Sequence, residues 1–493
     1  MLVVEFILLV VFLGLLVMVF NKKPKGLPPG EWGWPILGVL MPSGVSMEDH
    51  AKSLQKKYGD IFTWRLGSRT MVFLNNFTLI KSAFSNPVLQ DRPDFYTLDA
   101  FSNFKKQGLV NSNGIVWHNS RRFALRQLRE LGVGKSSLMD SMQYEAAILV
   151  KDFQEHVDTP QPIPWSLNVA ILNVIWQLTA DVRFQVDDPK VNEFNALITR
   201  SFLQSQGANL VFDMYPWLEY VAPKFIRKRL GIEDMLNTFG DIQKYMMSVI
   251  AEHEATLDPN NLRDYIDRYL VEMAGQRDDP NSTMSYEGLC VQMADIFTAG
   301  SESSTQTLRW VILHLAKYPE VQARCQREID AAVPRDTLPG LEHKANLPYL
   351  DAVLLEVHRF VSLAPLGLVH SATEDTELGG YKIPKNTILV PNLGMCHQDP
   401  HYWSHPDQFY PDHFLDKEGK CQARKESYLP FSIGRRVCPG EGLARMEQYI
   451  FMSALLQNFT FSVPDGKELV LEKDPDAILF NFPKDLEIVI RKR

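Results

Sequence analysis

The sequence predicts a mainly α-helical fold with small β-sheets, an α+β architecture in a single interleaved body. Apolar residues recur with helical periodicity over most of residues 115–360, where proline and glycine divide the pattern into separate helices. Short alternating segments at about residues 60–80 and 370–390 predict strands and turns. Because no repeat or long linker follows residue 35, strands from both flanks are expected to meet in one body.

The first twenty residues are almost wholly apolar, and Glu5 is their only charge. A helix of this length spans about 30 Å, the thickness of the hydrocarbon layer of a bilayer. Lysines follow at once (Lys22, Lys23 and Lys25), and the positive-inside rule then places the rest of the chain in the cytosol. A cleaved signal peptide would need a basic start and a small-residue cleavage site, and neither is present. We therefore predict a transmembrane signal anchor at residues 1–20.

Residues 21–35 are basic and rich in proline, with the run Pro24-Lys-Gly-Leu-Pro-Pro-Gly30 at their centre. Proline fixes φ and favours an extended, semi-rigid chain. This segment is predicted to be a hinge between the anchor and a catalytic body of residues 36–493.

Composition excludes several classes of protein. The 493 residues are 45% hydrophobic and 22% charged, as in ordinary globular proteins, and the net charge of −8 argues against a nucleic-acid binder. The five cysteines are odd in number and unclustered, which fits neither a disulfide framework nor a zinc site.

The most informative segment is Phe431-Ser-Ile-Gly-Arg-Arg-Val-Cys-Pro-Gly440. A thiolate on Cys438 could be the axial ligand of a haem iron and donate electron density toward bound oxygen. Gly434 and Gly440 would let backbone N–H groups approach the sulfur, Phe431 could shield it, and Arg436 could pair with a haem propionate. The alternative is a buried free cysteine in a glycine-rich turn.

A second segment, Met293 to Ser304, lies within a long predicted helix. Glycine inside a helix costs about 1 kcal/mol relative to alanine, so Gly300 is expected to open a groove where the backbone approaches a ligand. Glu302 and Ser303 follow. Dioxygen activation requires two protons, which a carboxylate beside a hydroxyl can relay through water. The alternative is a polar helix face with an incidental glycine.

Both segments resemble motifs of the cytochrome P450 superfamily. The cysteine loop is similar to Phe-x-x-Gly-x-Arg-x-Cys-x-Gly, and Ala299–Ser304 resembles Ala-Gly-x-(Asp/Glu)-Thr-(Thr/Ser), with Ser303 where threonine is usual. Serine lacks the methyl group that helps to fix the rotamer. The resemblance extends from the hinge to about residue 490 and is strongest to animal microsomal members of the family-2 clan, including arthropod members.

The resemblance assigns further residues. Glu356 and Arg359, three apart on one predicted helix face, resemble the structural Glu-x-x-Arg pair of the family. Its third partner is usually an arginine, but the corresponding element, Pro411–Phe414, has His413. Trp117 and Arg121 resemble Trp-x-x-x-Arg, and His370 begins a His-x-x-Thr match; these residues, with Ala299 and Gly300, are expected to contact haem.

The family implies a haem b cofactor, O2 as co-substrate and electrons from NADPH through the NADPH–cytochrome P450 reductase, with cytochrome b5 as a further candidate donor. It also implies hydroxylation or epoxidation of a lipophilic terpenoid, steroid, fatty acid or xenobiotic at the endoplasmic reticulum membrane.

Arg122, Arg126 and Arg129 share one helix face, which is either a solvated face or a surface for an acidic electron donor.

Two other functions use the same cysteine. One is an isomerase or lyase that rearranges a lipid hydroperoxide without a reductase, and the other is a haem-binding carrier or sensor. The acid and alcohol at Glu302 and Ser303 favour oxygen activation, since a peroxide substrate already contains the O–O bond.

The expected substrate lining is apolar and is carried over from the family: Phe101, Phe104, Leu109, Phe202, Phe297, Leu363, Leu366 and Phe480.

Overall fold

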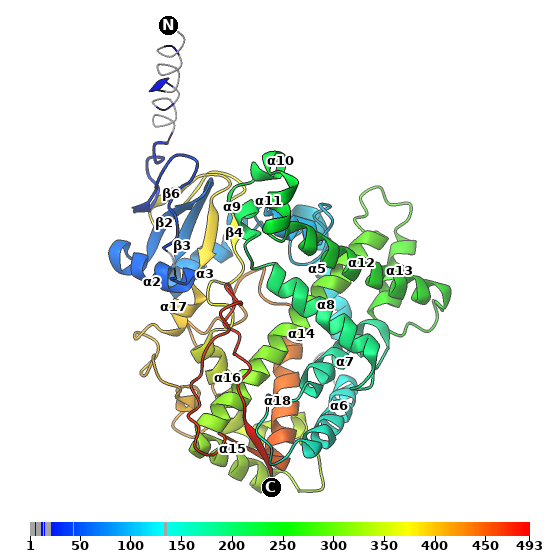
Figure 1. Cartoon of the computed structure of the whole chain (residues 1–493). Coiled ribbons are helices and arrows are strands. Elements are labelled where there is room, and N and C mark those ends of the chain that lie inside the picture. Colours follow the sequence, from blue (N-terminus) through cyan, green and yellow to red (C-terminus); the bar gives the residue numbers. More distant parts are fainter. Residues whose placement is uncertain (1–4, 6–10, 13, 15–20, 43, 133–135) are drawn as a thin grey trace.

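The computed structural model describes residues 5, 11–12, 14, 21–42, 44–132 and 136–493, and shows a large helical region beside a smaller β-sheet region (Figure 1). The prediction of a mostly helical fold with small sheets is confirmed. The helices are α2 (Met47–Tyr58), α3 (Phe77–Ser85), α4 (Tyr96–Phe101), α5 (Gly114–Glu130), α6 (Ser136–Glu155), α7 (Ser166–Ala180), α8 (Pro189–Gln204), α9 (Leu210–Met214), α10 (Leu218–Val221), α11 (Lys224–Arg229), α12 (Ile232–Ala255), α13 (Tyr265–Gly275), α14 (Tyr286–Lys317), α15 (Pro319–Ala332), α16 (Pro348–Val361), α17 (Leu393–His397) and α18 (Glu441–Asn458).

The main sheet joins segments that are far apart in the sequence. Its order is β1-β2-β3-β7-β4, and β3 pairs in parallel with β7 from Met71 opposite Ile388 to Leu74 opposite Pro391. Two two-stranded sheets, β5-β6 and β8-β9, complete the β structure. The strands are β1 (Gly30–Glu31), β2 (Ile61–Leu66), β3 (Arg69–Leu74), β4 (His370–Ser371), β5 (Thr376–Leu378), β6 (Tyr381–Ile383), β7 (Ile388–Pro391), β8 (Phe459–Ser462) and β9 (Val489–Lys492).

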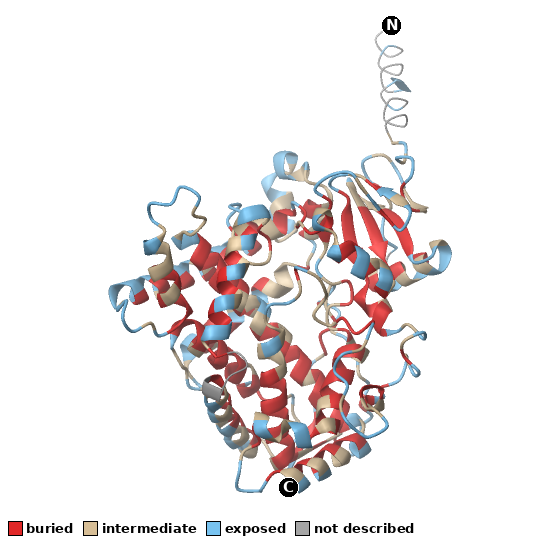
Figure 2. Cartoon of the chain, turned by 180° about the vertical axis from the view of Figure 1, so that it is seen from behind, coloured by how far each residue is buried: buried red, intermediate tan, exposed pale blue. Residues whose placement is uncertain are grey.

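Helix α14 runs through the helical region and packs against α7, α8, α12, α16 and α18. The largest cluster of buried apolar side chains joins α14 to α6, α7 and α18. Figure 2 colours the ribbon by burial and shows many buried residues along the inner helices of the helical region. Removing this apolar surface from water is the main force that holds the helices together. The buried contacts fix α14 and α18 relative to each other. Helix α14 carries the residues predicted to act on the oxygen side of the site, and α18 follows the loop with the predicted thiolate.

Part of the predicted hinge is fixed to the body. Gly30 and Glu31 form β1, which pairs in parallel with Thr63 and Trp64 of β2. A Cβ at Gly30 would lie 1.9 Å from the carbonyl oxygen of Thr63, so only glycine allows this close approach.

The predicted anchor, residues 1–20, lies for the most part outside the described residues. Within the residues that the structure describes, no helix is long and apolar enough to cross a membrane.

Candidate active site

Cys438 lies in the loop that precedes α18. Its amide donates to the carbonyl of Phe431 at 3.0 Å and closes the loop. The amides of Gly440 and Glu441 donate toward the sulfur. Because α18 begins at Glu441, the sulfur also lies near the positive end of a helix dipole. Both features favour a thiolate.

Cys438 is accessible in the structure. Cys438 is the exposed member of the five cysteines, of which three are buried and Cys421 is half-buried. Protein nevertheless surrounds the sulfur, and burial raises the pKa of the Cys438 thiol against the opposing effects of the Gly440 amide and the Arg121 guanidinium. A sulfur that is both accessible and surrounded by protein is suited to bind a metal ion, which deprotonates a coordinating thiol.

The two glycines of the loop differ in what they allow. Gly434 has a φ of 84°, and a Cβ there would lie 2.3 Å from the carbonyl oxygen of Phe84 in α3, so the close approach of the loop to α3 requires glycine. At Gly440, a Cβ would point toward Cys438 Sγ from 3.9 Å, so glycine leaves that side of the sulfur uncovered. The half-buried ring of Phe431 packs 5.2 Å from the ring of His358.

Three arginines converge beside this loop. Arg436 donates to the carbonyls of Gln90 at 3.0 Å and Ser112 at 2.8 Å, and its guanidinium lies 4.0 Å from the Trp117 ring. Arg121 donates to the carbonyl of Val437, the residue before the cysteine. Arg92, which the sequence analysis did not single out, donates to the carbonyls of Leu368 and Val369.

The positive charge of these arginines is not balanced. Within the described part of the chain, none of the three guanidiniums forms an ion pair with a carboxylate. Burial and the neighbouring guanidiniums lower the pKa of Arg92 to about 9. Burial and Arg121 lower the pKa of Arg436 to about 10, although Asp91 acts in the opposite direction. Buried charges are normally paired, so this cluster is suited to a ligand that carries negative charge.

Trp117 and His370 add two further polar groups. The indole N–H of Trp117 is buried and has no acceptor among the described residues. His370 Nδ1 lies 2.9 Å from the carbonyl of Leu89, so Nδ1 is the protonated nitrogen, and Nε2 can donate to a ligand only when the ring is charged. Burial and the neighbouring Arg92 hold the pKa of His370 well below its usual value, so the ring is neutral and does not donate from Nε2. A dianionic group with an iron atom, such as haem with its two propionates, fits the three guanidiniums and the Trp117 N–H together with the cysteine sulfur.

Ala299 and Ser303 form an accessible strip on α14. Ala299 is exposed, and Ser303, one turn later, is half-buried. Ser301 and Glu302, which lie between them, and Ser304, which follows them, are buried. The Ser303 hydroxyl donates to the Ala299 carbonyl at 2.6 Å. A hydroxyl of this kind can hold and pass a proton at Oγ.

Gly300 and Glu302 have environments that differ from the sequence-based expectation. A Cβ at Gly300 would lie 3.0 Å from Ile175 Cδ1, so the glycine allows α14 to pack closely on α7 rather than opening a groove. Glu302 is 1% exposed; its carboxylate accepts hydrogen bonds from Thr199 of α8 and, at 3.2 Å, from Gln306. Because side chains one residue apart on a helix diverge by about 100°, Glu302 and Ser303 face different neighbours.

The structure brings Glu356, Arg359 and His413 together in a fully buried network. Arg359 donates from Nε and Nη2 to the two carboxylate oxygens of Glu356 at 2.8 and 2.7 Å. His413 Nδ1 lies 3.2 Å from Glu356, while its Nε2 accepts the amide N–H of His405. Because Nε2 accepts, the imidazole is neutral and donates from Nδ1. The network is therefore neutral overall.

The expected lining residues divide into two groups. The ring of Phe297 is enclosed by Trp176 at 4.3 Å and Phe194 at 5.2 Å, and Leu366 is 7% exposed in an apolar cluster, so neither offers a ligand much surface. The other six retain accessible surface: Phe101, Phe104, Leu109, Phe202, Leu363 and Phe480. Phe202 and Phe480 lie 4.7 Å apart and join α8 to the C-terminal segment. Leu368, whose carbonyl accepts a hydrogen bond from Arg92, is 48% exposed.

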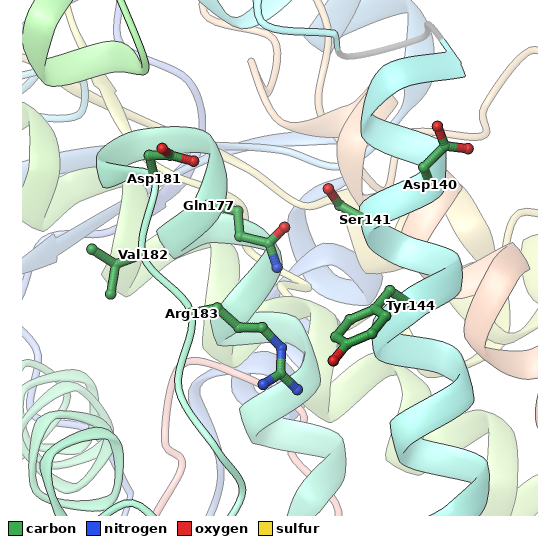
Figure 3. Close-up of a pocket in the computed structure, with 7 residues that line it drawn as sticks. All are labelled: Asp140, Ser141, Tyr144, Gln177, Asp181, Val182 and Arg183. Atoms are coloured by element: carbon green, nitrogen blue, oxygen red, sulfur yellow. The ribbon is translucent and has the colours of Figure 1, made fainter.

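A surface hollow of about 400 Å³ lies elsewhere, between α6 and the end of α7 (Figure 3). Asp140, Tyr144, Asp181 and Arg183 are among its lining residues, and Arg183 pairs with the buried Glu145 at 2.6 Å. None of the predicted site residues lines this hollow.

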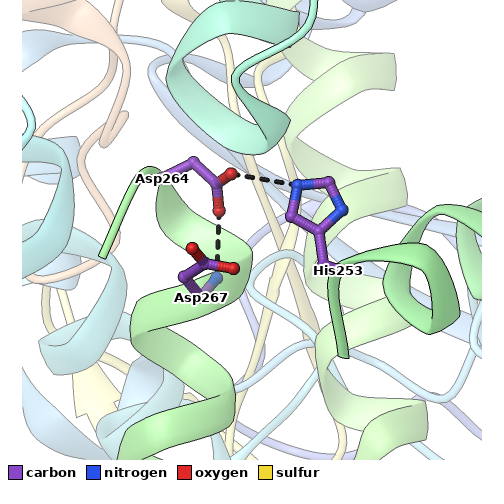
Figure 4. A group of neighbouring side chains, drawn as sticks. All are labelled: His253, Asp264 and Asp267. Carbon is purple, nitrogen blue, oxygen red and sulfur yellow. Dashed lines mark hydrogen bonds and ion pairs between the residues drawn. The ribbon is translucent and has the colours of Figure 1, made fainter. Parts of the chain in front are cut away.

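His253, Asp264 and Asp267 form a buried cluster with ligand atoms within 4.8 Å of one another (Figure 4). Arg263 already holds both carboxylate oxygens of Asp267, at 2.7 and 2.8 Å. Asp264 accepts the Asp267 amide at the start of α13 and lies 3.0 Å from His253 Nε2. With every carboxylate oxygen provided with a donor, the cluster is a helix-capping ion network rather than a metal site.

An accessible cysteine beside unbalanced cations is the arrangement expected of a haem-thiolate protein. Comparison with known proteins agrees with this class. The family model described as Cytochrome P450 matches residues 28–488. Cytochrome P450 2L1 of Panulirus argus is 50% identical over 478 residues, which cover 97% of each chain. Cytochrome P450 2J2 of Homo sapiens is 34% identical over 464 residues, 92% of this chain and 89% of the relative.

The chain belongs to the cytochrome P450 family, and it is a monooxygenase oxidoreductase of that family. The sequence-based prediction of this family, with similarity to family-2 members that include an arthropod one, is confirmed.

Arg92 was missed because a single arginine in Asp91-Arg92-Pro93 has no distinctive spacing. Only the folded chain places it beside both Arg121 and Arg436, and Arg436 follows much later in the sequence.

Proposed function

We propose that this cytochrome P450 inserts one atom of O2 into a lipophilic substrate, by hydroxylation or epoxidation, with electrons from NADPH that arrive through a reductase. The observation that carries this proposal is the accessible Cys438 sulfur beside three guanidiniums without counter-ions. Haem b accounts for both features, because its iron binds a thiolate and its two propionates balance cations. Bound haem would supply the iron at which oxygen is activated.

The protein groups would have separate tasks. Cys438 would bind the iron through Sγ, with the amides of Gly440 and Glu441 stabilising the negative charge of the sulfur. Arg121, Arg436 and the Trp117 N–H would hold the propionates, as would Arg92, which the structure adds to the set predicted from the sequence.

On the opposite side, we propose that Ser303 Oγ and the Glu302 carboxylate manage protons. The support is the half-buried Ser303 on the accessible strip of α14, with the hydrogen bond of its hydroxyl to Ala299. Glu302 is set back from this strip and bonded to Thr199, so it would need a change of hydrogen-bond partner or an intervening water to reach Ser303.

The proposed substrate class is lipophilic: a terpenoid, steroid, fatty acid or xenobiotic. The support is the apolar character of the six accessible lining residues and of Leu368. A pocket that is mainly apolar with few polar groups binds such molecules through buried apolar area.

The proposed partners are the NADPH–cytochrome P450 reductase and cytochrome b5. Arg122 and Arg129 are exposed on α5, the helix that also carries Trp117 and Arg121, and they could steer an acidic donor toward this side of the molecule. Arg126 of the same stripe is paired with Glu272, so its charge is partly balanced.

We propose a location at the endoplasmic reticulum membrane, with residues 1–20 as a single-pass anchor, residues 21–35 as the hinge and residues 36–493 as a cytosolic catalytic body. The support is the apolar run followed by three lysines.

Spectroscopy tests the central proposal. Reduced protein with carbon monoxide should show the Soret band of a thiolate-ligated haem, and Cys438→Ala should lose it. Cys396→Ala, a change at a buried cysteine, is the control and should keep the band. A thiolate band in Cys438→Ala would contradict the proposal. NADPH consumption with added reductase then separates a monooxygenase from a hydroperoxide isomerase, which needs no reductase.

A further inference from the structure

The first turn of α4 is capped by a side chain from another helix. The N-cap residue of α4 is Phe95, whose side chain cannot accept a hydrogen bond. Instead, the Asp213 carboxylate of α9 accepts the Thr97 amide at Oδ1, 2.9 Å away, and the Thr97 hydroxyl at Oδ2, 2.6 Å away. Asp213 is 0% exposed and Thr97 is 4% exposed. The cap of α4 therefore exists only while α9 packs against it.

Helix α9 is fixed to the main sheet. Arg69 Nε of β3 donates to the Asp213 carbonyl at 2.9 Å, and the Ser68 amide and hydroxyl both donate to the Met214 carbonyl at 3.0 Å. The ring of Phe212 packs 5.3 Å from that of Tyr96, in a small apolar cluster that is separate from the main core. Because its backbone is bonded to the sheet, α9 is the fixed partner, and α4 is the element that Asp213 positions.

The chain that follows α4 has strained backbone. Three of its residues that are not glycine have a positive φ of 52° to 60°: Asn103, Phe104 and Lys106. Residues other than glycine are held in this region only where surrounding contacts impose it. The stretch ends where the buried Asp295 of α14 accepts the amides of Leu109 and Val110. We name residues 96–108 the α4 segment; a buried acid holds it at each end.

The other polar contacts between the α4 segment and its neighbours involve half-buried side chains. Arg227 Nη2 of α11 lies 3.0 Å from the Tyr96 hydroxyl, and Gln243 Nε2 of α12 donates to the Phe101 carbonyl at 2.8 Å. Water can replace partners at such sites, whereas a buried donor that loses its acceptor pays the full cost of desolvation. Asp213 is therefore the contact whose loss frees the first turn of α4.

Phe101 and Phe104, two of the proposed lining residues, belong to the α4 segment. We propose that Asp213 is a positioning residue that caps α4 from α9, holds the α4 segment in place and thereby sets how fast a lipophilic substrate enters and leaves. Without the cap, the first turn of α4 unwinds and the strained residues after it relax. Asp213 acts only through Thr97 and touches no substrate. This inference rests on the proposed substrate lining.

The cap is retained when Asp213 takes up a proton. The ionised acid accepts both hydrogen bonds, and the protonated acid can donate from Oδ2 to Thr97 Oγ1 while Oδ1 still accepts the amide. Burial raises the pKa of Asp213 to about 6 against the hydrogen bonds from Thr97. The charged groups on the elements around it are Arg69 of β3, Asp94 and Asp99 beside and within α4, Arg227 of α11, and the exposed Glu233 and Asp234 of α12.

This pKa links the cap to pH. In water the pKa of an aspartate is about 3.9, so the capped state binds a proton more tightly than a state in which Asp213 is solvated. Stability of the capped state relative to the open state therefore falls as pH rises from about 4 to about 6, and is constant above that range.

Hydrogen exchange tests whether Asp213 caps α4. In Asp213→Ala, the amides of residues 97–101 should exchange about tenfold faster than in the wild type, since they lose hydrogen bonds to a charged acceptor. Asp213→Asn, whose amide can accept from the Thr97 N–H and donate to Thr97 Oγ1, should restore slow exchange. Ser46→Ala, which removes the side-chain cap of α2, is the matched control and should leave these amides unchanged. Exchange in Asp213→Ala like that of the wild type would overturn the inference.

Release of Nile red, a neutral apolar dye that fluoresces in apolar pockets, tests control of ligand exchange. In stopped-flow dilution of the haem-loaded protein, Asp213→Ala and Thr97→Val should each release the dye at least about threefold faster, because each loses part of the cap. Thr97→Val preserves side-chain shape, so a folding defect does not account for its effect. Asp213→Asn and Ser46→Ala should release the dye at the wild-type rate. Equal rates for Thr97→Val and the wild type would exclude control of exchange by the cap.

The pH profile separates this role from a purely structural one. Wild-type release should be about fourfold slower at about pH 5.5 than at about pH 7.5, whereas release from Asp213→Asn should not change. Identical profiles for the two proteins would overturn the inference and leave the proposed function intact. Absence of the thiolate Soret band would overturn the proposed function, while hydrogen exchange would still report on the cap.

Discussion

Individual charged residues determine how the two buried networks near Cys438 behave. The Glu356–Arg359–His413 network is neutral because the His405 amide keeps His413 Nε2 unprotonated. The arginine cluster is the opposite case, since Arg92, Arg121 and Arg436 repel one another without a paired carboxylate. One network therefore has its buried charges paired within the protein, whereas the other is expected to be completed by an anionic ligand.

Removing one arginine tests this expectation. Arg121→Gln should release haem about tenfold faster, because a charge-assisted hydrogen bond to a propionate contributes about 1.5 to 3 kcal/mol. Transfer of haem to apomyoglobin measures the rate. Arg122→Gln, at the exposed neighbouring position of α5, is the matched control and should behave like the wild type. Equal release rates for the two variants would argue against a propionate contact at Arg121.

At the scale of elements, the cysteine loop is positioned by its contact with α3. Gly434 touches the backbone of Phe84, and the ring of Phe84 stacks on His370 at 3.8 Å. His370 forms the edge strand β4, which pairs with β7. The loop, α3 and the main sheet are thus joined by contacts between segments that are far apart in the sequence.

Two glycine variants separate backbone strain from this contact. Gly434→Ala combines a positive φ of 84° with a clash at 2.3 Å against backbone, and should lower the free energy of unfolding by at least about 3 kcal/mol. Gly419→Ala has a similar φ of 77° but open space around its Cβ, and should lose only about 1 kcal/mol. Denaturant unfolding of the two variants checks this. A loss at Gly434 no larger than at Gly419 would show that the loop can move away from α3.

For the whole molecule, the described residues leave an apolar surface near the start of the chain. Trp34 and Leu40 are 69% and 63% exposed, and Tyr220 and Phe225 of α10 and α11 are 84% and 71% exposed. The hydroxyl of Tyr215, just before α10, donates to the Leu37 carbonyl at 2.9 Å, which holds the two segments together. Exposed apolar groups of this size commonly mark a surface for a membrane or another protein.

This surface predicts membrane binding without the anchor. A chain that lacks residues 1–20 should still sediment with phosphatidylcholine vesicles, since the rings can enter the interface. Tyr220→Ser with Phe225→Ser should reduce the bound fraction severalfold. Tyr144→Ser, at an exposed tyrosine on α6, is the control and should have no effect. Equal binding of the double variant and the control would exclude this surface as the contact.

Local patterns were enough to predict the family and much of the architecture. The strands predicted near residues 60–80 and 370–390 are β2, β3 and β4 to β7, because alternation and turn residues act over a few positions. Residues with fixed spacing, such as those of the Cys438 loop and the Glu356–Arg359 pair, could be named from the sequence because each set lies within a single short segment.

The sequence by itself determined the mostly helical fold, the membership of the cytochrome P450 family and the cysteine most suited to bind iron. Only the tertiary structure decided that Gly300 packs on Ile175, that Phe297 is enclosed by aromatic rings, and that Arg92 joins the arginine cluster. The physical reason is that burial, charge balance and hydrogen-bond partners depend on which distant segments meet, and spacing along one chain does not specify those meetings.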